Sequence, residues 1–137
     1  MVKHVPIIAL VVAALACPPA AARSQSPLAN LGLTETLNIT GTEPFWGGHL
    51  RTGRLVFETP EKPKGEVIRV RRTAGPRAIS FRGAGTQGMF AMVVRRHLCS
   101  DGMSDRDFPF EVTITYARGT LHGCGWSARR PYIEKPS

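Results

Sequence analysis

Three carboxylates, Asp101, Asp105 and Asp107, lie within seven residues of one another, with Ser104 among them. Hard oxygens at such close spacing could hold a divalent cation, but the spacing departs from the EF-hand loop and no glutamate supplies its bidentate ligand. Short polar side chains also accept hydrogen bonds from nearby backbone N–H groups and fix irregular loops. We therefore expect a self-bonded structural loop and no metal site.

Arg106 lies between Asp105 and Asp107 and is expected to pair with one of the three carboxylates, or with Glu43 across the fold. A binding role for the loop is the alternative interpretation. Its candidate residues are then Asp101, Met103, Ser104, Asp105 and Arg106.

A second unusual segment contains Glu43, Pro44, Phe45 and Trp46. An aromatic platform beside a carboxylate is typical of a binding site, so Glu43, Phe45 and Trp46 are candidate binding residues. The favoured interpretation is structural, because large aromatic side chains usually supply core area. Pro44 would then begin a strand and Trp46 would plug one end of the fold.

No set of residues suggests catalysis. His49, His97 and His122 fall on different expected strands, and no Gly-x-Ser-x-Gly segment or free cysteine supplies a nucleophile beside a base. Ser104 beside Asp105 is not a triad. We expect no catalytic residue and no cofactor.

The elements that must position these residues are strands. Apolar residues alternate with polar ones through most of the chain after residue 36, as in Ile68 and Val70 or Val112 and Ile114. Gly- and Pro-containing turns separate these runs at short intervals. The pattern predicts an all-β domain over residues 37–134, a small antiparallel meander barrel of seven or eight strands. Residues 23–36 are assigned to a linker.

The first residues predict export. Lys3 precedes an apolar run over residues 7–16, and small residues follow up to Ala22, as in a secretory signal peptide. Cleavage after Ala22 would remove residues 1–22. Cleavage before Cys17 would remove residues 1–16 and leave that cysteine for lipidation, as in bacterial lipoproteins. Both alternatives stay open, and both place the mature protein in the periplasm or cell envelope.

Cys99 and Cys124 remain as an even pair once Cys17 is set aside. In an oxidising compartment such a pair is expected to form a disulfide. His97 and His122 flank the two cysteines at mirrored distances, but we rate a metal site there well below the disulfide.

The balance of charge is strongly basic, with 18 Lys and Arg against 10 Asp and Glu and a formal net charge of +8. Loss of residues 1–22 removes Lys3 and leaves about +7. Such a domain can be attracted to anionic lipid or polyanionic wall surfaces, although a solvated arginine-rich exterior is the favoured interpretation. Basic residues with few interleaved aromatics argue against nucleic acid. We expect membrane contact only through a lipid anchor.

Two of these segments together resemble a family of small bacterial envelope proteins. The resemblance is carried by GTEPFW over residues 41–46, by C-x-DGMSDR-x-F-P-F over residues 99–110, and by the closing L-x-G-C motif over residues 121–124. Phe108 stands where the family often has tyrosine. The resemblance implies a periplasmic or lipoprotein-like barrel and supplies no reaction. Its architecture looks similar to lysozyme inhibitors and to heat-shock lipoproteins of the META type.

We therefore expect a non-enzymatic envelope module that binds a protein, wall or anionic surface component. A small-ligand carrier with its site at the barrel mouth near Trp46 is one alternative. An inhibitor of a wall-degrading hydrolase is another, although a charge of +7 would disfavour its approach to a basic lysozyme.

Overall fold

The computed structural model describes residues 2, 16–17, 19, 28–42 and 45–136. Most of the predicted signal peptide and the candidate residue Glu43 lie outside this part of the chain. No helix among the described residues has the length and hydropathy to cross a bilayer. The strands are β1 (Leu37–Gly41), β2 (Gly47–Arg51), β3 (Arg54–Thr59), β4 (Lys62–Ala74), β5 (Ala78–Gly85), β6 (Gly88–Ser100), β7 (Arg106–Tyr116), β8 (Gly119–Trp126) and β9 (Ile133–Glu134).

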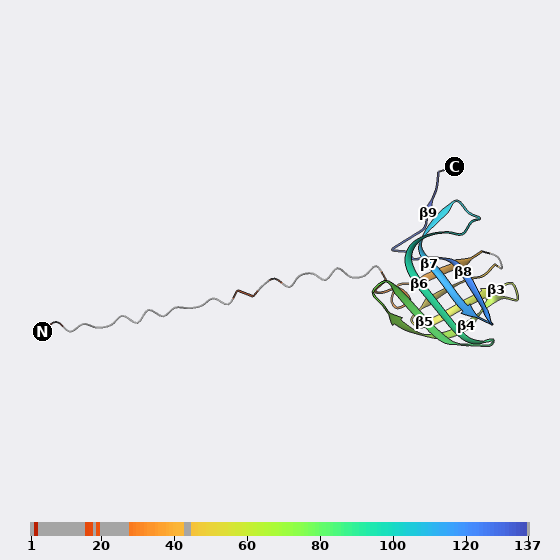
Figure 1. The fold of residues 1–137 in the computed structure, drawn as a ribbon, viewed down its shortest axis with the longest axis horizontal. Coiled ribbons are helices and arrows are strands. Elements are labelled where there is room, and N and C mark those ends of the chain that lie inside the picture. The colour runs from red at the N-terminus through yellow and green to blue at the C-terminus, as the bar shows by residue number, and fades with distance from the viewer. Residues whose placement is uncertain (1, 3–15, 18, 20–27, 43–44, 137) are drawn as a thin grey trace.

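Strands β1 to β8 form a closed antiparallel meander in which each strand pairs with the next, and β8 pairs back to β1. The predicted all-β barrel is therefore confirmed. Closure leaves no exposed edge among these eight strands. The short strand β9 is an addition that pairs with the first residues of β7, beyond the rim of the barrel (Figure 1).

Alternation along the strands fills the barrel with apolar side chains. Ile68 and Val70 of β4 point inward and are buried, as are Val112, Ile114 and Tyr116 of β7. The residues between them face outward. Period-two patterning selects this arrangement because successive strand side chains point to opposite faces.

One end of the barrel is closed by residues 28–36, which precede β1. Leu28 and Leu31 are 4% and 0% exposed within the main core. Arg72, the next inward position of β4 after Val70, donates hydrogen bonds to the carbonyls of Leu28, Ala29 and Leu31 at 2.7–3.1 Å. The assignment of residues 28–36 to a linker is thus wrong, because this segment is packed into the barrel end. We call this end the plugged end.

The opposite end is filled by aromatic rings. Phe57 contacts Trp46, Phe90 and Tyr116, with ring centroids 5.8–6.0 Å apart. Tilted and edge-on contacts of this kind are favourable for aromatic pairs. The rings form the floor of the barrel mouth, at the end where β3 turns into β4 and β7 into β8.

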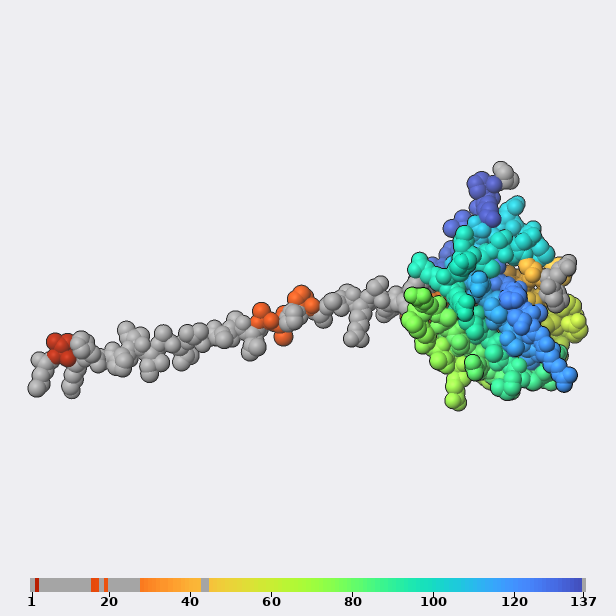
Figure 2. All heavy atoms as spheres, in the orientation of Figure 1, coloured from red at the N-terminus to blue at the C-terminus, as the bar shows by residue number. Residues whose placement is uncertain are grey.

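The β6–β7 hairpin extends past the barrel and is fastened to it by a disulfide. Cys99 of β6 and Cys124 of β8 are bonded, with their Cα atoms 5.6 Å apart, although β7 lies between these strands in the sheet. The predicted disulfide is therefore confirmed. Figure 2 shows β6, β7 and β8 covering one face of the molecule, with the residues near the C-terminus projecting above them.

Candidate functional site

Trp46 lies against two glycines that come from different motif segments. A Cβ atom at Gly41 would overlap the Trp46 indole, and one at Gly123 would lie 2.7 Å from the same ring. The indole is 6% exposed, and the loop before it is closed by a 2.8 Å hydrogen bond from the Gly41 N–H to the Trp46 carbonyl. The glycines are therefore required so that the ring can approach the backbone of β1 and β8.

Phe45 and Met103 project on the outer side of this packing. They are 55% and 56% exposed, and they line a shared open groove of about 430 Å³. We call it the Phe45–Met103 groove. Among the described residues, its lining contains one carboxylate and no basic residue, and consists of Thr40, Gly41, Phe45, Trp46, Gly47, Glu58, Thr59, Pro60, Pro63 and Met103.

Met103 reaches the groove because Asp101 shapes its loop. Asp101 Oδ1 accepts hydrogen bonds from the N–H groups of Met103 (3.0 Å) and Ser104 (2.8 Å), and Oδ2 accepts one from the Ser104 hydroxyl (2.8 Å). Burial raises the pKa of Asp101, but these bonds and the charge of Arg106 outweigh it and hold the pKa below its ordinary value. The carboxylate thus holds the loop that carries Met103.

Arg106 and Asp107 face away from the groove, toward β9. Arg106 pairs with Glu134 at 3.3 Å and lies over the Tyr132 ring at 4.2 Å, whereas Asp107 pairs with Lys135 at 3.0 Å. An open depression of about 450 Å³ borders Ser104, Asp105 and Arg106 on this side. The predicted binding residues are therefore divided between two surfaces.

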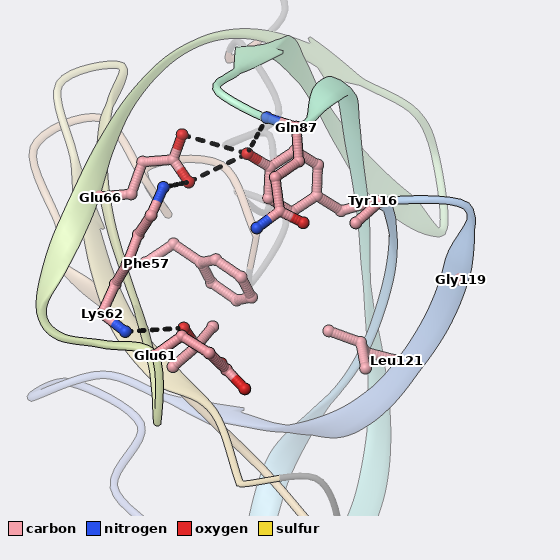
Figure 3. Close-up of a pocket in the computed structure, with 10 residues that line it drawn as sticks. Phe57, Glu61, Lys62, Glu66, Gln87, Tyr116, Gly119 and Leu121 are labelled. Atoms are coloured by element: carbon pink, nitrogen blue, oxygen red, sulfur yellow. Dashed lines mark hydrogen bonds and ion pairs between the residues drawn. The ribbon is translucent and has the colours of Figure 1, made fainter.

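A second concavity lies at the barrel mouth (Figure 3). It has a volume of about 320 Å³, with Tyr116 and Leu121 of β7 and β8 on one side and Lys62 and Glu66 of β4 on the other. Phe57 supplies an apolar floor. A site with an apolar floor and a few polar groups at its rim is the usual form of a small-molecule pocket.

Glu66 is the most constrained charge at the mouth. Its side chain is 8% exposed, lies 3.5 Å from the Lys62 ammonium, and accepts hydrogen bonds from the Tyr116 hydroxyl and the Thr86 N–H. Burial raises the pKa of Glu66, but the bonds from Thr86 and Tyr116 and the Lys62 charge together hold the pKa below its ordinary value. A carboxylate that is ionised and already bonded in this way is a structural clamp, poorly placed to accept a proton from a ligand.

Sequence reasoning named none of the mouth residues as a site. The sequence does contain a signal for Glu66. It is two residues from Ile68 and four from Val70 on β4, so it points to the same inward face. A charged residue at an inward position needs a partner, because burying an unpaired charge is costly. Its partner Tyr116 comes from β7, and no local pattern links the two.

Within the part of the chain that the structure describes, no group of three or more His, Cys, Asp or Glu side chains is arranged to hold a metal ion. Comparison of the chain with protein-family models, with curated proteins and with solved structures finds no match.

Proposed function

We propose that this protein is an exported, non-enzymatic binding module of the cell envelope that holds a partner protein in the Phe45–Met103 groove. The observation that carries the proposal is the convergence of Phe45 and Met103, two large apolar side chains that are each more than half exposed. Grouped exposed apolar side chains on a soluble domain mark an interaction surface.

The construction of the groove supports a dedicated role. Its Phe45 wall rests on the buried Trp46, and its Met103 wall stands on a loop held by Asp101 and by the Cys99–Cys124 disulfide. A surface supported on both sides loses little conformational entropy when a partner binds. The contacts that hold these two segments in place also keep Phe45 and Met103 exposed to solvent.

The charge of the groove indicates its partner. The whole chain is strongly basic, yet the lining residues that the structure describes include Glu58 and no lysine or arginine. We propose that the partner is a protein that presents an extended, apolar and uncharged or weakly basic segment. A strongly acidic partner would instead be attracted to the basic faces of the molecule.

Photo-crosslinking in the exporting cell tests this proposal. Benzoylphenylalanine in place of Phe45 should give a defined crosslinked protein, and adding Met103→Glu should abolish that product. The same probe at Met89, which is 73% exposed and is not part of the groove lining, is the matched control. Identical products from both positions, or a Phe45 product that is indifferent to Met103→Glu, would refute the proposal.

Binding of a small amphipathic molecule at the barrel mouth is a second candidate function. It is favoured by the cavity above Phe57, which contacts Trp46 with ring centroids 5.9 Å apart. N-phenylnaphthylamine should gain fluorescence on binding there, and Leu121→Trp should remove the gain by filling the space. Equal fluorescence with and without that substitution would exclude the mouth as the site.

Export is supported by the signal-like start and by the disulfide. The N-terminus of the mature protein distinguishes the two processing routes. Mass spectrometry should find either a chain that begins at Arg23 or one that begins at a lipidated Cys17. A chain that retains residues 1–16 in the cell envelope would contradict both.

A further inference from the structure

Five arginines form a continuous array on the outer surface of four neighbouring strands. The sheet register places Arg51 of β2 opposite Arg54 of β3, and Arg54 opposite Arg69 of β4. Arg71, on the same face of β4 two residues beyond Arg69, lies opposite Arg82 of β5. All five side chains are exposed. We call these residues the arginine face.

The arginine face lacks compensating acids. None of its members forms an ion pair with a carboxylate in the part of the chain that the structure describes. Elsewhere arginines do meet acids, since Arg95 lies opposite Glu111 and Arg106 pairs with Glu134. Like charges placed directly opposite each other on a sheet are destabilising. The repulsion within the array therefore lowers the stability of the barrel slightly, and an external anionic group would offset it.

The position of the array relates it to the N-terminal part of the chain. The turn between Arg51 and Arg54 is bonded to the segment that plugs the barrel, because the Thr52 N–H and hydroxyl both donate to the Leu33 carbonyl at 3.2 and 3.3 Å. Residues 28–36 lead directly from the part of the sequence that predicts an export signal or lipid anchor. The arginine face thus begins at the end of the barrel where that part of the chain joins it.

We propose that the arginine face docks on the surface of an anionic phospholipid bilayer, with the plugged end toward the membrane. Guanidinium groups spread over four strands do not converge on one point, so they suit a plane of phosphates better than a single small anion. Guanidinium also forms bidentate hydrogen bonds with phosphate oxygens. This surface is separate from the Phe45–Met103 groove, so the inference does not depend on the proposed function.

Vesicle co-sedimentation tests the inference. The Cys17→Ser form of the exported protein excludes any contribution from a lipid anchor. It should bind vesicles of phosphatidylglycerol mixed with phosphatidylcholine, and should not bind phosphatidylcholine alone. Each arginine near an anionic surface contributes about fivefold to affinity, so Arg54→Gln, Arg69→Gln and Arg71→Gln together should weaken binding roughly a hundredfold. Added salt should release the protein, because the attraction is screened.

A second triple variant with the same change in net charge is the matched control. Arg95→Gln, Arg96→Gln and Arg118→Gln alter exposed arginines outside the array and should weaken binding only a few fold. The variant of the arginine face should also keep a Tm equal to or above that of the parent, since it removes opposed like charges.

Three results would overturn the inference. The first is an equal loss of binding in both variants, which would show that only net charge matters. The second is failure of the parent protein to bind phosphatidylglycerol vesicles. The third is retention on a polyanionic glycan, with heparin as the probe, together with no vesicle binding, which would assign the face to a wall polymer instead.

Discussion

The Tyr116 hydroxyl donates to the Glu66 carboxylate, 3.1 and 2.9 Å from its two oxygens. The same hydroxyl accepts a 3.1 Å hydrogen bond from the Gln87 N–H. Glu66 lies on β4 and Tyr116 on β7, strands that are not neighbours in the sheet. This pair therefore joins opposite walls of the barrel across its mouth.

Tyr116→Phe should destabilise the protein at neutral pH, because it removes a hydrogen bond to a nearly buried carboxylate. A bond to a charged group contributes about 1.5–3 kcal/mol, and we expect a loss of this size in the free energy of unfolding by urea. In a Glu66→Gln background the same substitution should cost about 1 kcal/mol or less, because its charged partner is gone. Equal losses in both backgrounds would show that the two groups are not coupled.

Stability should fall in acid because Glu66 and Asp101 both have lowered pKa values. A carboxyl whose pKa is lower in the folded state binds fewer protons there than in the unfolded chain. Its contribution is complete above the ordinary carboxyl pKa of about 4 and is lost as the pH falls through the folded value. Urea unfolding across that range should show a shallower acid decline for Glu66→Gln combined with Asp101→Asn. An unchanged slope would mean that other carboxyls control acid stability.

Gly41→Ala should disrupt the packing of Trp46, since the added methyl group would overlap the indole. Overpacking costs about 1–3 kcal/mol, and we expect the upper end because Gly123 and Phe57 confine the ring on other sides. Trp fluorescence during thermal unfolding measures the effect. Gly119→Ala is the control, because the nearest atom to a Cβ there lies 3.8 Å away. Equal stability of the two variants would contradict the packing described.

Leu31→Ala should show that residues 28–36 belong to the folded domain. Leu31 is fully buried, so its truncation should lower the free energy of unfolding by about 2–5 kcal/mol. Leu33, which is 42% exposed, provides the control, and Leu33→Ala should have little effect. A Leu31→Ala protein as stable as its parent would show that this segment is a linker and does not contribute to the stability of the domain.

Replacing Cys99 and Cys124 together by serine should cost about 3–4 kcal/mol, the chain-entropy value for a closed loop of this length. The loss should appear as a lower urea midpoint, and reductant should lower the stability of the parent but not of the variant. Alkylation should find no free thiol at either position in natively isolated protein. Reactive thiols there would contradict the disulfide.

The sequence by itself determined the class of fold and the content of the core. Alternation is a local property, and side chains such as Ile68 and Val70 can be assigned to one face from their spacing alone. The cysteine pairing followed from a count, because only two cysteines remain in the domain. The same spacing also predicts that Glu66 and Arg72, the charged residues on either side of Ile68 and Val70, point inward on β4, although their partners cannot be read from it.

Only the tertiary structure decided which distant segments meet. Leu28 and Leu31 lie in a turn-rich stretch without a strand period, so no pattern indicated that they fill the barrel end. The approach of Phe45 to Met103, the bond from Tyr116 to Glu66 and the alignment of five arginines all depend on strand register and closure. Register and closure are set by the packing of the whole barrel, and no short stretch of sequence carries that information.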